Sequence, residues 1–224
     1  MLVTIQRFDG KAYRPAGEMC DEIMAKTKLN NKERLLIEGL RVVHQHGLAA
    51  TSVRDIANAA DVPLGSFTNH FPSKSAFGLE VLERYRERSD AEVLETLRND
   101  QLRPLDRLSA YIDSTRDFLA QNQMRDGCLC GNISAEINEH SDEIVNRVLK
   151  AFSDDEASIA HCLRAAVEEG ELPPNTDVEE LAGYILSSIQ GAFLIAKVRR
   201  SSEPVDRFKR VLFAQLGVRR RELT

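Results

Sequence analysis

The segment Thr51–Lys74 constrains the fold most, because it encodes two short helices separated by a sharp break. The apolar residues of the first helix recur at the spacing of one helical face: Val53, Ile56, Ala57 and Ala60. Ser52, followed three residues later by Asp55, predicts a capping box at the helix N-terminus. Pro63 predicts the break, because proline lacks an amide donor and disfavours helical backbone in the residue before it.

The second helix of this segment is short and has one apolar side. Phe67 and Phe71 lie four residues apart, so both rings face the first helix. The other side carries short hydrogen-bonding side chains that suit base edges and phosphates in a major groove: Ser66, Thr68, Asn69 and His70. This spacing predicts a helix-turn-helix. A plain helical hairpin in an all-α protein is the alternative that spacing alone leaves open.

The same segment resembles the DNA-binding domain of the TetR family of bacterial transcriptional regulators. The first helix of the family corresponds to Thr51–Ala57, and its Val-x-x-Gly-x-hydrophobic-Tyr-x-His-Phe run corresponds to Val62–Phe71. The lysine that follows in the family corresponds to Lys74. Thr68 replaces the usual tyrosine of the family, which commonly touches the DNA backbone, and this departure puts that phosphate contact in question.

The resemblance implies an all-α fold of about nine helices, with an N-terminal helix-turn-helix head and a C-terminal helical body for ligand binding and dimerisation. It also implies a ligand-responsive repressor that leaves a palindromic double-stranded DNA operator when a small molecule or electrophile acts on the body. Asn69 is expected to pair with adenine and Lys74 to meet a phosphate. The residues expected to bind DNA are Thr51, Ser52, Arg54, Leu64, Gly65, Ser66, Thr68, Asn69, His70 and Lys74.

Charge is distributed unevenly along the 224 residues, whose net charge is −5. Residues 24–88 hold ten Lys/Arg and seven Asp/Glu, a balance of +3, whereas residues 89–224 hold seventeen and twenty-four, a balance of −7. The positive segment attracts phosphates and the acidic remainder does not. We therefore expect a poorly ordered N-terminal extension at 1–23, a DNA-binding domain at 24–76 and a ligand-binding and dimerisation domain at 77–224.

Composition indicates a soluble chain with a substantial core, since 42% of the residues are apolar and 29% are charged. No uninterrupted apolar run approaches the ~20 residues of a membrane-spanning helix, and the N-terminus lacks the apolar core of a signal peptide. We therefore expect a cytoplasmic protein with no membrane partner. The four cysteines show no disulfide spacing, so free thiols are expected.

Two of these cysteines, Cys128 and Cys130, lie within the glycine-bracketed segment Gly127–Gly131. A helix is predicted to follow from Ile133 to about Asn138, and a helix dipole lowers the pKa of a nearby cysteine because it stabilises the thiolate. The alternative is that Cys128 is a small buried apolar residue, the commonest state of a free cysteine. Cys130 is expected to be a purely structural thiol.

The run Gly127–Asn132 resembles a branch of the TetR family that includes the repressors of N-ethylmaleimide reductase and of acrylate metabolism. That branch responds to reactive electrophiles or small unsaturated acids, so the resemblance implies a small-molecule inducer here. Lys197 is expected to be a cation that lowers the pKa of the Cys128 thiol further. The candidate ligand or sensor residues are Cys128, Cys130, Asn132 and Lys197.

Two functions of other classes use the same thiols. Cys128 can act as the nucleophile of an enzyme, but the sequence identifies no general base or oxyanion site for it. Cys128 and Cys130 can instead bind a soft metal with His161 or Cys162 in a metal-sensing regulator, although Cys-x-Cys is not a standard zinc spacing. We expect no catalytic site, no resident metal and no cofactor.

The C-terminal helices are unusually apolar. The predicted helix at 177–198 is apolar on nearly all sides, which requires burial on more than one side. Another apolar helix is predicted at 204–216. Because a palindromic operator requires a two-fold symmetric reader, we expect these helices to form a homodimer, with Ile189 as a mid-interface position. A core within one chain is the alternative.

Overall fold

The structure is a computed structural model that describes residues 29–217, so the predicted extension at 1–23 lies outside the described residues. Within that range the chain forms nine α-helices and one 3-10 helix without any strand, which confirms the all-α prediction. The elements are α2 (Asn31–His46), α3 (Val53–Ala59), α4 (Leu64–His70), α5 (Lys74–Glu95), α6 (Pro104–Gln121), α7 (Leu129–Ala135), η1 (Ile137–Glu139), α8 (Asp142–Glu168), α9 (Val178–Arg199) and α10 (Glu203–Gln215).

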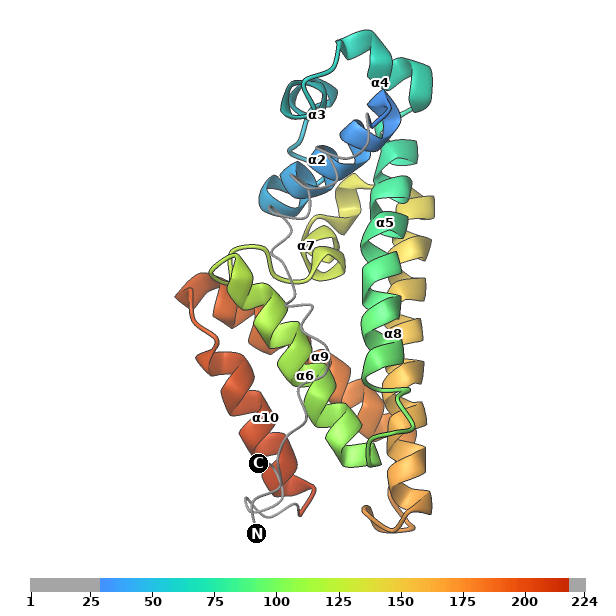
Figure 1. The fold of residues 1–224 in the computed structure, drawn as a ribbon, viewed down its shortest axis with the longest axis vertical. Coiled ribbons are helices and arrows are strands. Elements are labelled where there is room, and N and C mark those ends of the chain that lie inside the picture. The colour runs from blue at the N-terminus through green and yellow to red at the C-terminus, as the bar shows by residue number, and fades with distance from the viewer. Residues whose placement is uncertain (1–28, 218–224) are drawn as a thin grey trace.

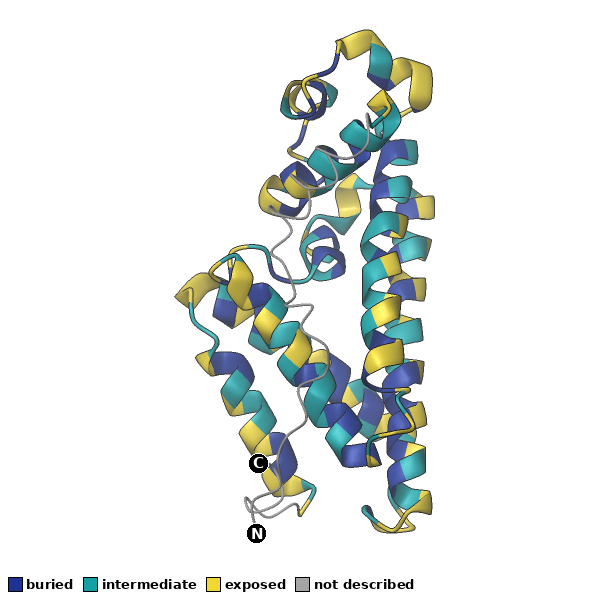
Figure 2. Cartoon of the chain, viewed as in Figure 1, coloured by how far each residue is buried: buried dark blue, intermediate teal, exposed yellow. Residues whose placement is uncertain are grey.

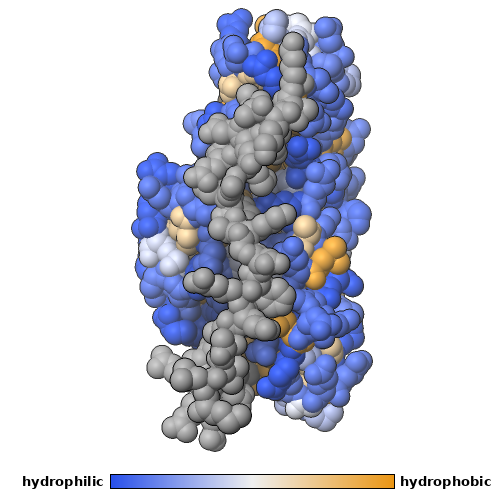
Figure 3. Space-filling view, in the orientation of Figure 1, coloured by the Kyte–Doolittle hydropathy of each residue, from blue (hydrophilic) through white to orange (hydrophobic). Residues whose placement is uncertain are grey.

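Two parts follow one another along the long axis of the molecule (Figure 1). α2, α3 and α4 form a head at one end, and α5 runs from the head along the body beside α8. α6, α9 and α10 complete the body, and α7 lies between these helices and the head. On the face shown in Figure 3 the described surface is mostly hydrophilic, with small separate apolar patches. α5 and α7 are therefore the elements placed to connect body and head.

Local caps and an aromatic cluster hold the head together. The predicted capping box of α3 is present: the Ser52 hydroxyl accepts from the Asp55 amide, and the Asp55 carboxylate accepts from the Ser52 amide. The ring centroids of Phe67, Phe71 and Phe77 lie 5.1–5.2 Å apart, within the range that aromatic pairs favour. Because Phe77 belongs to α5, this cluster fixes α4 on the first turn of α5.

Gly47 ends α2 with a φ of +87°, a backbone conformation that favours glycine. Its amide donates to the carbonyl of Val43 at 2.8 Å and closes the helix. A Cβ at this position would lie 2.7 Å from a carboxylate oxygen of Glu136. The missing side chain therefore lets the residues that follow α7 approach the loop before α3.

The apolar core has two parts, and its buried residues follow the inner faces of the helices (Figure 2). One part joins the head to Leu129, Cys130 and Ile133 of α7 and to the first turns of α8. The other joins α6, the second half of α8, α9 and α10. Because the core of the head extends well beyond residue 76, α7 packs as part of the head as well as of the body.

α9 is the one helix among the described residues long and apolar enough to cross a membrane, with a mean hydropathy of 1.5 over its most apolar window. This differs from the expectation of no such segment, although the core helix of a soluble protein meets the same criterion. Only 39% of that window is buried within the chain. The exposed apolar side chains of α9 are Tyr184, Leu194, Ile195 and Val198.

Ile189 does not lie on that exposed side. It is 1% exposed and packs in the core of its own chain. Our choice of Ile189 as an interface position is therefore wrong, since a charge there would disrupt the fold of one chain before it affected any contact between chains.

Candidate functional site

The side chains expected to read DNA lie mainly on the outer sides of α3 and α4. Ser66 is half-buried and accepts a hydrogen bond from Asn31 at 3.0 Å, while the Thr68 hydroxyl donates to the carbonyl of Gly65 at 3.0 Å. α3 and α4 contact each other, and most of the other residues of the set are exposed. The exposed members of the set are Ser52, Arg54, Leu64, Gly65, Thr68, Asn69 and His70.

Thr51 and Lys74 hold the turn before α3. Thr51 is 2% exposed and its hydroxyl donates to the carbonyl of Gly47 at 2.6 Å, so it closes the turn before α3 and does not lie on the exposed surface. The Lys74 ammonium donates to the carbonyls of Ala49 at 2.9 Å and Thr51 at 3.2 Å. Since an ammonium has three donors, one remains for a phosphate.

Most cations of the head are paired with carboxylates at the surface. Lys32 lies 2.7 Å from Glu80, and Arg34 lies 3.2 Å from Asp61. Such exposed pairs contribute little to stability because water and salt screen them. Arg54, on α3, is exposed and outside these pairs. Breaking these pairs therefore costs little free energy, and the head can offer its cations to a phosphate backbone.

Cys128 is the N-cap of α7, which begins at Leu129 and not at Ile133 as the sequence predicted. Its sulfur accepts a hydrogen bond from the Gly131 amide at 3.5 Å, and its backbone is extended with a φ of −79° and a ψ of 127°. The sequence misplaced this helix because cysteine is not among the usual N-cap residues. Cys128 thus lies closer to the helix dipole than expected.

Two hydrogen bonds reach the Cys128 sulfur, from the Gly131 amide at 3.5 Å and from the Tyr85 hydroxyl, and Cys130 lines the same cavity. The Cys130 thiol is the largest influence and lowers the pKa of Cys128 to about 6, aided by the Gly131 amide and by the Tyr85 hydroxyl at 3.8 Å, and opposed by burial. Burial raises the pKa of Tyr85, so its hydroxyl stays protonated and can donate. The interaction with Cys128, followed by burial, raises the pKa of Cys130 far above its ordinary value. The pair therefore divides into a thiolate, Cys128, and a thiol, Cys130.

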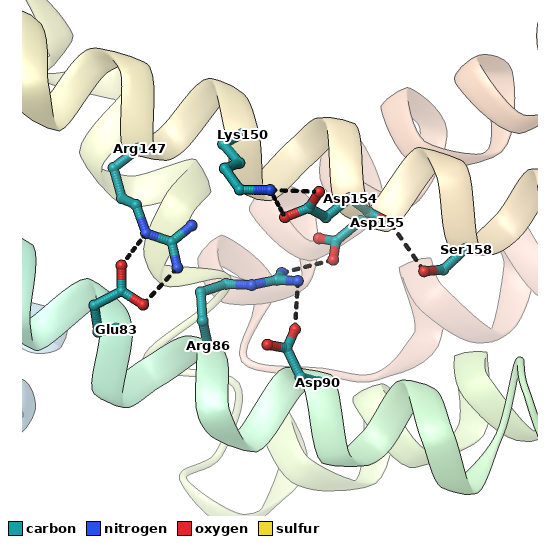
Figure 4. A network of polar contacts seen from close by, with 8 residues as sticks. All are labelled: Glu83, Arg86, Asp90, Arg147, Lys150, Asp154, Asp155 and Ser158. Carbon is teal, nitrogen blue, oxygen red and sulfur yellow. Dashed lines mark hydrogen bonds and ion pairs between the residues drawn. The ribbon is translucent and has the colours of Figure 1, made fainter.

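A cavity of about 40 Å³ between α5, α6, α8 and α9 adjoins the two sulfurs, with Tyr85, Arg86, Tyr111 and Gln190 also in its wall. The guanidinium of Arg86, 5% exposed, donates to Asp155 at 2.6 Å and to Asp90 at 2.7 Å (Figure 4). Burial alone would lower the pKa of Arg86, but these carboxylates raise it, so the guanidinium stays charged. The cavity thus combines a fixed ion pair with two thiols.

Lys197 does not contact the thiol whose pKa it was expected to lower. Its ammonium donates to the Asn132 carbonyl oxygen at 3.1 Å, and the Asn132 amide donates to the carbonyls of Asp126 at 2.7 Å and His44 at 3.3 Å. His44 Nε2 lies 2.8 Å from the carbonyl of Gly127. Lys197 and Asn132 therefore anchor the loop before α7 to α9 and α2, while Cys130 and Tyr85 act directly on the sulfur.

The metal-sensing alternative requires a third ligand near the two thiols. Cys162 instead donates to the carbonyl of Pro104 at 3.0 Å in the core of the body. Among residues 29–217 no group of three or more His, Cys, Asp or Glu side chains is placed to hold a metal. The structure therefore brings no third ligand of these types to Cys128 and Cys130 within that range.

Glu136 connects the end of α7 to the head, a role that the sequence did not reveal. Its carboxylate accepts a hydrogen bond from the Leu48 amide at 2.6 Å, beside Gly47, and lies 3.2 Å from His140 Nε2. The side chain of His140 is nearly buried. Residues 48 and 136 are 88 positions apart, so no local pattern could predict this contact. One end of α7 thus carries the thiol, and the other end leads to the start of the helix-turn-helix.

Known families match both parts of the chain. Residues 35–81 match the family described as "Bacterial regulatory proteins, tetR family", and residues 104–212 match the "Tetracyclin repressor-like, C-terminal domain". The HTH-type transcriptional repressor DhaR of Mycobacterium sp. strain GP1 is 33% identical over 193 residues, which cover 86% of this chain and 94% of DhaR. The chain belongs to the TetR family. It is therefore a helix-turn-helix transcriptional regulator.

Two further similarities concern the whole fold of this TetR-family regulator. A crystal structure of a regulatory protein TetR from Rhodobacter sphaeroides superposes with a TM-score of 0.77 at 28% identity, covering 80% of this chain and 95% of that one. The reduced form of Escherichia coli NemR superposes with a TM-score of 0.72 at 28% identity, covering 81% and 94%. Both similarities span head and body together.

The rate at which iodoacetamide alkylates Cys128 should increase with pH, with a midpoint near pH 6. The thiolate is the nucleophile, and the pKa of Cys128 is lowered to about 6. Cys130→Ala removes the largest cause and should raise the midpoint by ~1 unit or more. Lys197→Met should leave it near the wild-type value, because Lys197 bonds Asn132. Mass spectrometry of the alkylated protein measures the rates. A wild-type midpoint at the ~8.5 of a free cysteine would contradict this assignment.

Proposed function

We propose that this TetR-family chain is a cytoplasmic, homodimeric repressor that leaves a palindromic operator when an electrophilic small molecule reacts with Cys128. The observation that carries the proposal is the position of α7, whose N-cap is the low-pKa thiol of Cys128 and whose C-cap, Glu136, accepts a hydrogen bond from the Leu48 amide of the head. The names of DhaR and NemR, both given as transcriptional repressors, support repression.

The proposed chemistry is addition of the Cys128 thiolate to an α,β-unsaturated carbonyl compound. The thiolate bonds to the β-carbon and the resulting enolate takes up a proton, so no leaving group is required. The adduct needs space, and the cavity of about 40 Å³ is small. Accommodating even a few atoms therefore requires α7 or its neighbours to move.

Movement of α7 would reach the head through a small number of bonds. The loop before α7 is tied to α2 by His44 and Asn132, and the residues after α7 are tied to the Leu48 amide by Glu136. These bonds hold the C-terminus of α2 and the loop that starts the helix-turn-helix. A shift of α7 therefore changes the position of the reading helix, α4, relative to the partner's equivalent helix.

Substitution of Glu136 tests this connection. Glu136→Ala removes the acceptor for the Leu48 amide, so alkylation of Cys128 should proceed at the wild-type rate but weaken DNA binding less, by ~0.5–2 kcal/mol of coupling free energy. Glu136→Gln keeps a carbonyl acceptor and should retain the response. Fluorescence anisotropy on the DNA upstream of the gene, with and without N-ethylmaleimide, measures both. An Ala variant that responds like wild type would rule out this route.

The exposed polar surface of α3 and α4 is the proposed DNA face. Asn69→Ala should reduce discrimination at one base pair by ~1–3 kcal/mol, since asparagine makes paired hydrogen bonds to adenine. Arg54→Ala should weaken binding to all sequences and reduce the salt slope by about one unit. Lys74→Ala should do the same and also destabilise the turn that its ammonium closes. Binding titrations over a salt series and against base-substituted operators separate these effects. Unchanged binding in all three variants would refute the assignment.

The proposed dimer interface is the exposed apolar side of α9 with α10. A groove of about 460 Å³ lies between these helices, with Tyr184, Ile195, Phe208 and Val211 in its wall. Tyr184 and Ile195 are 50% and 44% exposed. An apolar groove next to exposed apolar side chains is typical of a surface that a second chain covers.

Ile195→Glu should convert the dimer to monomers, because each protomer loses ~1.5–3 kcal/mol of apolar burial and gains a charge at the contact. Leu94→Glu is the matched control, since Leu94 is 64% exposed on α5, away from this groove. Light scattering after size-exclusion chromatography gives the mass, and circular dichroism confirms that both variants fold. A folded Ile195→Glu dimer would place the interface elsewhere.

A further inference from the structure

Cys128 is the N-cap of α7 and Cys130 lies in the first turn of that helix. Both residues contribute to the wall of the same cavity, and the Cys128 sulfur accepts a hydrogen bond from the Gly131 amide of this turn at 3.5 Å. Cys128 is half-buried, whereas Cys130 is 2% exposed. The two residues therefore differ in exposure, although they lie two positions apart on one turn.

We propose that a hydroperoxide oxidises Cys128 and that Cys130 then closes an intrachain Cys128–Cys130 disulfide. Cys130 is thus a second reacting residue of the site, and hydroperoxides are a second class of inducer besides electrophiles. This inference shares one premise with the proposed function, which is that Cys128 is a reactive thiolate.

The backbone permits this disulfide. Residues two apart are separated by at most ~7 Å between Cα atoms, and disulfides form at Cα separations of about 4.4–6.8 Å. Cys128 has an extended backbone and Cys130 a helical one, so the chain between them is shorter than fully extended. The N-cap conformation also turns the Cys128 sulfur back over the first turn of α7, toward the Gly131 amide at 3.5 Å. That is the turn on which Cys130 lies.

The reaction balances with the peroxide as the only oxidant. The Cys128 thiolate attacks one peroxide oxygen, the O–O bond breaks, and the departing alkoxide takes a proton to become an alcohol, leaving a sulfenic acid on Cys128. The Cys130 sulfur then attacks the Cys128 sulfur, the S–O bond breaks, and hydroxide leaves with the Cys130 proton as water. Two thiols and one hydroperoxide become one disulfide, one alcohol and one water.

The order of the two steps follows from the electrostatics of the pair. The largest cause that raises the pKa of Cys130 is its interaction with the Cys128 thiolate, followed by burial, while the nearby charge of Arg86 lowers it. Oxidation of Cys128 to a neutral sulfenic acid removes the anion. The pKa of Cys130 then falls, with Arg86 still in place and with burial and Asp155 still opposing the fall, so Cys130 is a better nucleophile after Cys128 has reacted than before.

Closing the disulfide removes the cap of α7. The Cys128 sulfur can no longer accept the Gly131 amide hydrogen bond in its present position, and loss of an N-cap weakens the first turn of a helix. The same helix leads to Glu136 and the Leu48 amide of the head. Oxidation and alkylation thus act on the head through one element.

The test uses the full chain with Cys20→Ser and Cys162→Ala, which leaves only Cys128 and Cys130 of the four cysteines. The protein is treated with one equivalent of hydrogen peroxide, its remaining thiols are blocked with iodoacetamide, and it is digested with trypsin. Both cysteines fall in the peptide 126–147. This peptide should lose two hydrogen atoms in mass and gain no iodoacetamide label. Dithiothreitol should restore both the labelling and binding to the upstream DNA.

The variant Cys130→Ser in the same background removes the second reacting sulfur but keeps a hydrogen-bond donor at that position, so it isolates the second step. Its sulfenic acid should persist, be trapped by dimedone in at least tenfold greater yield than in the parent, and proceed with excess peroxide to a sulfinic acid that dithiothreitol does not reverse. Cys128→Ala should leave Cys130 unoxidised. A parent protein that forms sulfenic acid but no disulfide would overturn this inference and leave the proposed function intact. A Cys128 that reacts with neither peroxide nor N-ethylmaleimide would overturn both.

Discussion

The buried guanidinium of Arg86 determines how α5 and α8 pack against each other. A charge that is 5% exposed is stable only if it is paired and hydrogen-bonded, and Arg86 finds Asp90 on its own helix and Asp155 on α8. α5 and α8 therefore align at the register where these groups meet, with Arg147 and Glu83 forming a further pair between the same two helices (Figure 4). Because α5 also contributes Phe77 to the aromatic cluster, this register sets the position of the head relative to the body.

The same ion pair shapes the chemistry of the thiols. Burial raises the pKa of Asp155, with Arg86 opposing the rise, and Asp155 in turn raises the pKa of both cysteines. A thiolate can form beside this carboxylate because interactions with Cys130, Gly131 and Tyr85 stabilise it. Cys128 is thus activated by neutral donors held in a fixed arrangement, and the arrangement depends on the packing of α5, which supplies Tyr85, against α7.

Local patterns in the sequence predicted the elements that local physics determines. The Ser52–Asp55 capping box, the break at Pro63 and the docking of Phe67 depend on residues a few positions apart, and the structure contains all three. The roles of Lys74, Lys197 and Glu136 depend on partners that the fold brings from distant positions. The start of α7 was predicted four residues late because its cap is a sulfur atom. Burial of Ile189 could not be predicted either, since periodicity shows that α9 is apolar but not which side the same chain covers.

Gly47 has a consequence for how this regulator can vary. Any other residue there would adopt a strained backbone at a φ of +87° and would also press a Cβ against the Glu136 carboxylate at 2.7 Å. The two penalties coincide at the joint between the reading helices and the helix that carries the thiol. Under the proposed route, a substitution in the cavity wall would change which small molecules fit beside Cys128, whereas a substitution at Gly47 would disturb the joint itself. Chains that keep this joint can therefore differ in what reaches the thiol and still transmit a movement of α7 to the head in the same way.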